Sequence, residues 1–254
     1  MTNIEFVNKA IEIAMTYKTL YAKGMYGHVL TESNISSLSN DYPYWYIEKE
    51  SVSGKTNGEH LKQYTGKGYF GFDCICLIKG ILWGWSGDLD HYRGGSQYEL
   101  NDVPDETEQA YIDSFCTDVT TDFSNLVPGE FLWKDGHCGI YIGNGLAVDS
   151  TNILPQDGVA VTAVANMGNK AGYTSRSWTK HGKLKYLTYI SEATGNSQIQ
   201  VDKSSYCSGE KINVKIGNLD SSYTEPWIGL YRYEIGSNFK GNSLGMWKNV
   251  TKNS

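Results

Sequence analysis

Apolar residues near the start of the chain recur three or four positions apart, at Ile4, Val7, Ile11, Ala14 and Met15. This spacing predicts an amphipathic helix over residues 3–18. Thr2 and Glu5 would begin it with a capping box, because the hydroxyl and the carboxylate can satisfy free N–H groups of the first turn. A second apolar stretch runs from Cys74 to Trp83 and predicts a buried helix.

Polar and Gly-containing stretches surround the second helix. Residues 19–60 contain many Ser, Asn and Tyr residues, and we expect them to be mostly loop. Residues 86–104 are also polar and rich in Gly, and a modest helix is expected over 106–116. A long loop in a compact domain is often functional, so the first of these segments is of interest beyond its conformation.

The pattern changes to short apolar runs after residue 127. Five segments are expected to be strands: EFLWK, HCGIYIG, LAVDS, GVAVTAV at 158–164 and KLKYLTYI at 183–190. The pair Asn144-Gly145 separates two of them and is a strong hairpin signal. Helices followed by an antiparallel sheet make residues 1–190 an α+β domain.

A Ser-, Gly- and Asn-containing stretch at 191–198 is interpreted as a linker. The remaining residues, 199–254, have β-like segments without helical periodicity, so we expect a small all-β module there. In its segment PWIGLYRY, alternation places Trp227, Tyr231 and Tyr233 on one face. That face either stacks on sugar rings of a cell wall or carbohydrate ligand or forms the core of the module.

Composition narrows the classes of function. The chain has 254 residues, 40% of them hydrophobic, and a net charge of -6, which disfavours a nucleic acid partner. No apolar run reaches the roughly 20 residues of a membrane helix. The first residues lack a basic segment followed by an apolar one, so we expect synthesis in the cytoplasm without a signal peptide. Five scattered cysteines argue against a disulfide framework, and we expect a monomer.

One set of residues is suited to nucleophilic catalysis. Cys74 follows Asp73 where an extended segment turns into a helix. A helix N-terminus lowers the pKa of a thiol, and its free N–H groups can hold an oxyanion. His137 begins an expected strand and can serve as the base, while Asp149 on the next strand can fix the imidazole tautomer.

Each residue also has an ordinary structural interpretation. A free cysteine is more often a small buried hydrophobe, and we assign that role to Cys76, Cys116, Cys138 and Cys207. His137 alone would be a polar residue at a strand start, and Asp149 alone a residue at a strand end. The order Cys, His and acid along one chain favours the catalytic interpretation.

The segments GFDCICLIKGILWGW and PGEFLWKDGHCGIYIGNGLAVDST resemble the NlpC-type cell-wall cysteine peptidases of the papain-like superfamily. TLYAKGMYG at 19–27 resembles a segment of phage-type lysins, and SWTKHGKLKYL at 177–187 resembles the closing strand of the family. The resemblance implies a papain-like fold with Cys74, His137 and Asp149 as the catalytic residues. It also implies bacterial peptidoglycan as the substrate and no cofactor.

The sequence departs from the family at two places. Ile75-Cys76 replaces a pair of small residues, so Cys76 competes formally with Cys74, although residues two apart on a helix point about 200° apart. Many family members carry His where Asp149 stands.

Candidates for substrate contacts are Tyr21, Asp73, Trp45 and Trp85, and core packing is the alternative for the aromatic residues. The scattered His residues do not predict a metal site.

These observations predict a peptidoglycan hydrolase, either an endopeptidase or an N-acetylmuramoyl-L-alanine amidase, that meets the wall after phage or prophage lysis or another non-classical release. Two alternatives stay open from the sequence. One is a catalytically silent protein that only binds wall glycan or peptide, and the other is an acyl or amide transferase with the same three residues.

Overall fold

A computed structural model describes residues 1–51, 54–153 and 156–190, together with four strands farther along the chain. They divide into two compact units, the first containing Met1–Tyr189 and the second the four later strands. The helices of the first unit are α1 (Asn3–Thr16), α2 (Glu32–Asp41), α3 (Asn57–Lys62), α4 (Cys74–Leu82) and α5 (Glu108–Ala110). Short 3₁₀ or π-helical turns are η1 (Tyr44–Glu48), η2 (Leu100–Asp102), η3 (Tyr111–Phe115), η4 (Phe123–Asn125) and η5 (Ala165–Met167).

The first unit contains two sheets. The smaller has the order β1-β3-β2, with β1 (Lys18–Tyr21), β2 (Tyr26–Val29) and β3 (Tyr69–Phe72). The larger has the order β4-β10-β5-β6-β7-β8-β9. Its strands are β4 (Cys116–Thr120), β5 (Phe131–Lys134), β6 (His137–Gly143), β7 (Leu146–Thr151), β8 (Gly158–Val164), β9 (Ser175–Arg176) and β10 (Lys180–Leu184). All its pairs are antiparallel except β8–β9.

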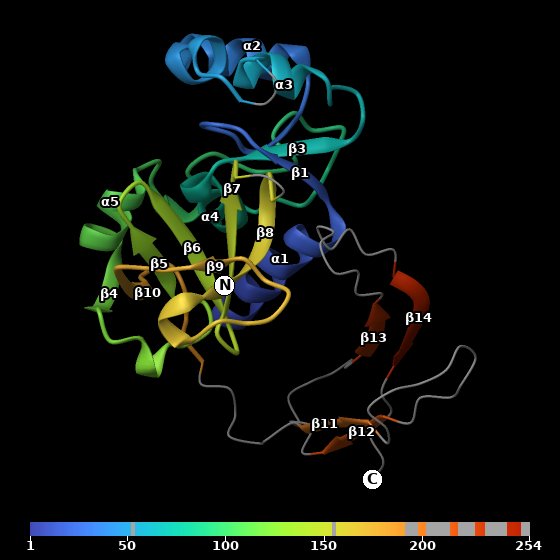
Figure 1. The fold of residues 1–254 in the computed structure, drawn as a ribbon, viewed down its shortest axis with the longest axis vertical. Helices are drawn as coiled ribbons and strands as arrows, with labels where there is room; N and C mark the ends of the chain where they lie inside the picture. The colour runs from blue at the N-terminus through green and yellow to red at the C-terminus, as the bar shows by residue number, and fades with distance from the viewer. Residues whose placement is uncertain are drawn as a thin grey trace. The chain divides into compact units, whose positions relative to one another are not determined.

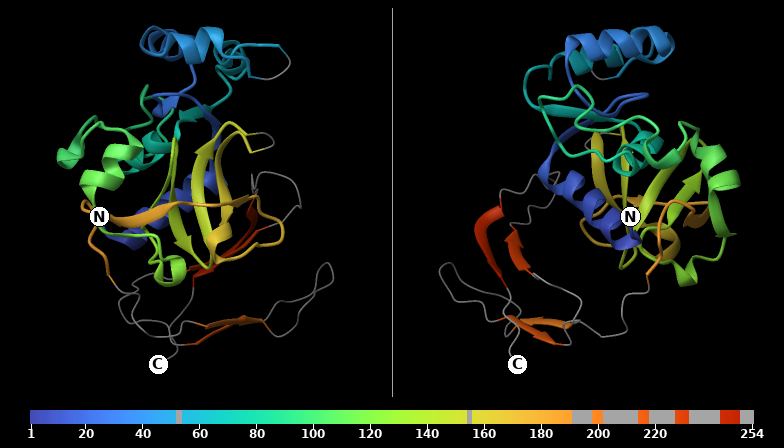
Figure 2. Two further views of the ribbon diagram at one scale, coloured as in Figure 1. Left: turned by 60° about the vertical axis from the view of Figure 1, so that its left-hand side comes forward. Right: turned by 180° about the vertical axis from the view of Figure 1, so that it is seen from behind.

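This arrangement confirms the α+β class and the strands expected at β5 to β8. Asn144 and Gly145 both have positive φ, 53° and 72°, as the hairpin signal between β6 and β7 requires. The helices α1 and α4 pack on one face of the larger sheet (Figures 1 and 2). The face opposite them carries a smaller cluster that contains Tyr141 and Trp178.

The helix α1 begins as the sequence predicted. The Thr2 hydroxyl accepts the Glu5 N–H, and the Glu5 carboxylate accepts the Thr2 N–H at 2.7 Å. The fully buried stripe differs from the expected one, because it follows Phe6, Val7, Ala10 and Ile13. Ile4, Ile11, Ala14 and Met15 lie at its margins and are partly exposed.

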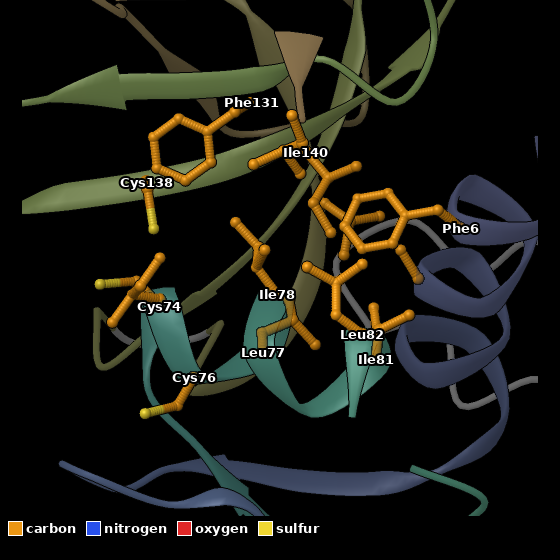
Figure 3. Close-up of a cluster of buried hydrophobic side chains, with 14 of the residues drawn as sticks. Phe6, Cys74, Cys76, Leu77, Ile78, Ile81, Leu82, Phe131, Cys138 and Ile140 are labelled. Carbon is orange, nitrogen blue, oxygen red and sulfur yellow. The ribbon is translucent and has the colours of Figure 1, made fainter. Parts of the chain in front are cut away.

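The helix α4 is the centre of the main core. All its residues are buried, and Leu77 and Ile78 are completely inaccessible. They pack with Phe6 of α1 and with Phe131 and Ile140 of the sheet (Figure 3). The buried helix expected from this mainly apolar segment is confirmed, and it includes the buried Lys79.

The prediction of loop over residues 19–60 was wrong. This stretch contains β1, β2, α2, η1 and α3. The strand β1 pairs in parallel with β3, and β2 pairs antiparallel with β3, so the partner strand lies about 40 to 50 residues farther along the chain. The helix α2, ESNISSLSND, buries only Asn34 and Ile35, which is too little for an apolar stripe to be visible in the sequence.

The strand expected over 183–190 is displaced towards the N-terminus. Residues Lys180–Leu184 form β10, and the chain then leaves the sheet. The cause is Tyr189, whose hydroxyl accepts the Leu184 N–H and donates to the Gly129 carbonyl, both within 3.0 Å. The apolar residues after Leu184 therefore pack against the main core instead of alternating along a strand.

In the second unit, β11 (Gln198–Val201) pairs antiparallel with β12 (Val214–Gly217), and β13 (Trp227–Tyr231) pairs antiparallel with β14 (Ser243–Asn249). Residues 191–197 of the expected linker and Tyr233 lie outside the described residues, as do the side chains of Trp227 and Tyr231. Within the described ranges, no helix combines the length and the hydropathy that crossing a bilayer requires.

We predict that Thr2→Ala lowers the free energy of unfolding by about 1 kcal/mol, because the Glu5 N–H loses its acceptor. Thermal denaturation should show a decrease in Tm of roughly 3 °C. Thr2→Ser keeps the hydroxyl and is the matched control. Equal Tm values for Thr2→Ala and the native chain would show that the cap does not stabilise the fold.

Candidate active site

Asp73 determines where α4 begins. It is the N-cap residue and is only 2% exposed. One carboxylate oxygen, Oδ1, accepts the Cys76 N–H at 2.7 Å, and the other, Oδ2, accepts the Gly24 N–H at 2.7 Å. Because both oxygens are used by the backbone, the expected role of Asp73 in substrate binding is replaced by a structural one: it holds the helix start beside the turn at Gly24.

Cys74 is therefore the first residue of α4, as the sequence indicated. Asp73 satisfies the third N–H of the helix, and the N–H groups of Cys74 and Ile75 lie at its open end. The side chain of Cys74 is buried within the first turn, with 5% of the residue exposed. The positive end of the helix and two free donors thus surround the thiol.

His137 reaches this point from the start of β6. The turn before it contains Gly136 with φ of 69°, and Lys134 pairs with His137 across that turn. Further along the hairpin, Ile140 pairs with Val148, and this register puts Asp149 on the same face as His137. The His137 Nε2 atom lies 3.4 Å from Asp149 Oδ2.

The His137 ring also lies close enough to the Cys74 thiol for each group to shift the pKa of the other. The structure thus brings the three residues proposed as catalytic together, although they come from α4, β6 and β7. Since Nε2 faces Asp149, the other ring nitrogen, Nδ1, is the one available to the thiol.

The surroundings favour a thiolate–imidazolium pair. A hydrogen bond from the Cys138 thiol, with a further one from His137, outweighs burial and lowers the pKa of Cys74 to about 6. Burial lowers the pKa of His137, but hydrogen bonds to Asp149 and Cys74 outweigh it and raise this pKa to about 9. Between these values Cys74 is mainly a thiolate and His137 mainly an imidazolium.

Asp149 is held by residues that the sequence analysis did not single out. It is completely buried, and its Oδ2 atom is paired with Nε of Arg176 and accepts the Thr162 hydroxyl at 3.3 Å. Arg176 itself is 7% exposed. A buried carboxylate needs such partners, because an isolated buried charge is strongly unfavourable.

The ring of His137 is covered by Trp178. The two rings are stacked, with centroids 5.5 Å apart and planes 11° apart. Gly139 makes room for the indole, since a Cβ there would lie 2.9 Å from its Cη2 atom. Asn166 fixes the Trp178 backbone by donating to its carbonyl at 3.0 Å and accepting its N–H at 2.8 Å. An aromatic face against an imidazolium is electrostatically favourable.

Neither Arg176 nor Trp178 could be assigned from local sequence. Arg176 belongs to β9, a two-residue strand that pairs in parallel with β8. The only signal is the segment SRSW itself, a cation and an indole shortly before a predicted strand. That combination is equally typical of an exposed loop.

The structure supports some of the other residues predicted to contact substrate and excludes one of them. Tyr21 and Trp45 are half-buried and their rings lie 5.9 Å apart. Burial and the charges of Asp73 and Cys74 raise the pKa of Tyr21, which keeps its hydroxyl protonated as a donor beside the site. Trp85 is 2% exposed and donates to the Gly27 carbonyl at 3.0 Å, so the expectation that it lines a groove is wrong.

The two competing cysteines of α4 point in different directions. Figure 3 shows the Cys74 and Cys76 sulfur atoms on different sides of the helix. Burial and the charge of Asp73 raise the pKa of Cys76 well above that of an ordinary thiol. Cys138 is completely buried, as expected for a core residue, but it also contacts Cys74, which the sequence did not indicate.

Among the residues that the structure describes, no three His, Cys, Asp or Glu side chains gather in a way that could hold a metal ion. Comparison of the chain with family models, with curated proteins and with solved structures gives no match.

We predict that iodoacetamide alkylates Cys74 with a midpoint near pH 6, because the thiolate is present above that pH and the thiol below it. His137→Ala should move the midpoint upwards by removing one hydrogen bond. Peptide mass spectrometry identifies the alkylated cysteine. Cys116, whose pKa burial raises to about 12, is an internal control that should remain unlabelled at neutral pH. A native midpoint above pH 8 would contradict the ion pair.

Proposed function

We propose that the protein is a cysteine hydrolase that cleaves an amide bond in the peptide part of bacterial peptidoglycan. The observation that supports this most directly is the row of Cys74, His137 and Asp149 at the N-terminus of a buried helix, with His137 Nε2 3.4 Å from Asp149 Oδ2. We further propose that the first unit has an NlpC-type, papain-like fold, in which a helix carrying the nucleophile packs on an antiparallel sheet carrying the base.

In the first step, the Cys74 thiolate attacks the amide carbonyl carbon. The carbonyl oxygen becomes an oxyanion next to the N–H groups of Cys74 and Ile75. The imidazolium of His137 then donates its Nδ1 proton to the amide nitrogen as the carbon–nitrogen bond breaks. The amine leaves, and the other half of the substrate remains as a thioester on Cys74.

In the second step, water attacks the thioester and His137, now neutral, accepts a proton from it. The carbon–sulfur bond breaks, a carboxylic acid is released and the thiolate–imidazolium pair re-forms. Asp149 holds the imidazole with Nε2 protonated throughout and stabilises the imidazolium. Trp178 restricts the ring to this orientation.

The choice of peptidoglycan as substrate rests on the sequence segments around Cys74 and His137. Tyr21, whose pKa is affected by the Cys74 charge, and the neighbouring Trp45 are both half-buried aromatic residues of a kind suited to stacking on a sugar or a peptide. The bond would be in the stem peptide for an endopeptidase, or between muramoyl and L-alanine for an amidase. The enzyme would meet this substrate on release from the cell by phage or prophage lysis.

We predict that Cys74→Ser reduces hydrolysis of purified peptidoglycan by at least 10³-fold, a loss of the size seen when a nucleophile is removed. Cys76→Ser should retain most activity, because its side chain points away from the site. Mass spectrometry of the released fragments measures the rate and identifies the scissile bond. The reverse pattern would assign the nucleophile to Cys76.

The same assay distinguishes the proposed hydrolase from the two alternative functions. Transfer of the acyl group to an added amine, with little release by water, would indicate a transferase with the same residues. Binding to walls without any fragment release, and without alkylation of Cys74 at neutral pH, would indicate a silent binding protein.

We also propose that the second unit, with strands β11 to β14, binds the cell wall. A chain that ends at Tyr189 should still cleave soluble wall fragments at a rate within about twofold of the full chain. It should sediment with intact walls several-fold less. The inactive Cys74→Ser full chain is the control for sedimentation, because it cannot release itself by cleavage. Equal sedimentation of the two chains would rule out targeting by the second unit.

A further inference from the structure

Cys138 lies against Cys74. It follows His137 on β6, pairs with Trp133 across the sheet and points towards the start of α4 (Figure 3). Cys74 and Cys138 belong to the same buried cluster, and the two thiols are close enough for each to shift the pKa of the other. All the cysteines that the structure describes are free thiols, so this contact is between two reduced side chains.

The two thiols differ in ionisation. Cys74 is the more acidic thiol, whereas burial and the neighbouring Cys74 charge raise the pKa of Cys138 well above its usual range. A thiolate is the form that reacts with peroxides, and a second thiol in contact with it can trap the first oxidation product. Cys76 lacks this position, because it points to a different side of α4 and is hydrogen-bonded to Asp73.

We propose that Cys138 is the resolving thiol for Cys74, so that peroxide converts the pair into a reversible disulfide that switches the nucleophile off and protects it. This proposal concerns the two thiols alone and does not depend on the substrate of the enzyme.

The reaction balances with a hydroperoxide as the oxidant. The Cys74 thiolate attacks one peroxide oxygen, the oxygen–oxygen bond breaks and hydroxide leaves, which oxidises Cys74 to a sulfenic acid. The Cys138 sulfur then attacks the Cys74 sulfur, the sulfur–oxygen bond breaks and the disulfide forms. The sulfenic hydroxyl leaves as water with the proton of Cys138.

The two side chains already meet in one buried cluster, with the Cys138 sulfur pointing towards the start of α4 (Figure 3). A disulfide requires the two sulfur atoms to approach to roughly 2 Å. The backbone of β6 is held by pairing with β5 and β7, and the start of α4 is held by Asp73, so rotation of the two side chains brings the sulfur atoms together. The disulfide would occupy the Cys74 sulfur and prevent attack on a carbonyl.

The test uses the full chain treated with hydrogen peroxide, followed by N-ethylmaleimide and peptide mapping without reduction. We expect a linked pair of peptides that contain Cys74 and Cys138, which dithiothreitol separates. Alkylation of Cys74 by iodoacetamide should disappear and return in parallel. Oxidation of Cys74 to sulfinic acid without a linked peptide, or linkage to Cys76, Cys116 or Cys207, would overturn the proposal.

Two variants test which cysteine pairs with Cys74 and whether the disulfide protects it. Cys76→Ser should form the linked peptide as the native chain does. Cys138→Ser keeps a donor beside Cys74 but cannot form a disulfide, so it should give no linked peptide, and its Cys74 should reach the sulfinic and sulfonic states several-fold faster, with no recovery in dithiothreitol. Equal rates of irreversible oxidation in Cys138→Ser and the native chain would contradict a protective role. The native map decides the linkage even if Cys138→Ser does not fold.

Discussion

The carboxylate of Asp73 is the constraint on which the site depends. Its two oxygens bind the N–H groups of Gly24 and Cys76, and its own N–H donates to the Met25 carbonyl at 3.0 Å. These bonds join the β1–β2 turn to the first turn of α4. One buried residue makes all three hydrogen bonds. Cys74, the next residue, is therefore held at a fixed position relative to the small sheet.

A row of buried side chains with charges of alternating sign begins at Cys74. The Cys74 thiolate faces the His137 imidazolium, which faces the Asp149 carboxylate, which is paired with Arg176. The two inner charges each lie between partners of opposite sign and the two outer charges each face one such partner, which offsets the cost of removing them from water. The acidity of Cys74 is therefore a property of the whole row and of Cys138, and any break in the row should weaken the thiolate.

The two faces of the larger sheet position different parts of the candidate site. One face packs on α1 and α4 and holds Cys138 against the nucleophile. The other face holds Trp178, which covers the ring of His137 and depends on the missing side chain of Gly139. Since His137 lies at the very start of β6, its ring reaches the helix end while its strand remains fixed by pairing on both sides.

The sequence by itself determined the elements whose signals are local. A capping box begins α1, a mainly apolar run forms α4, and Asn144-Gly145 forms the turn between β6 and β7, so Cys74, His137 and Asp149 could be selected as one candidate site. Only the tertiary structure decided the pairing of β1 with β3, the burial of Trp85, and the placing of Arg176, Trp178 and Cys138 around the candidate residues. These depend on contacts between segments far apart in the chain. Such contacts are set by which apolar faces and buried charges fit together, and a local pattern of residues does not record them.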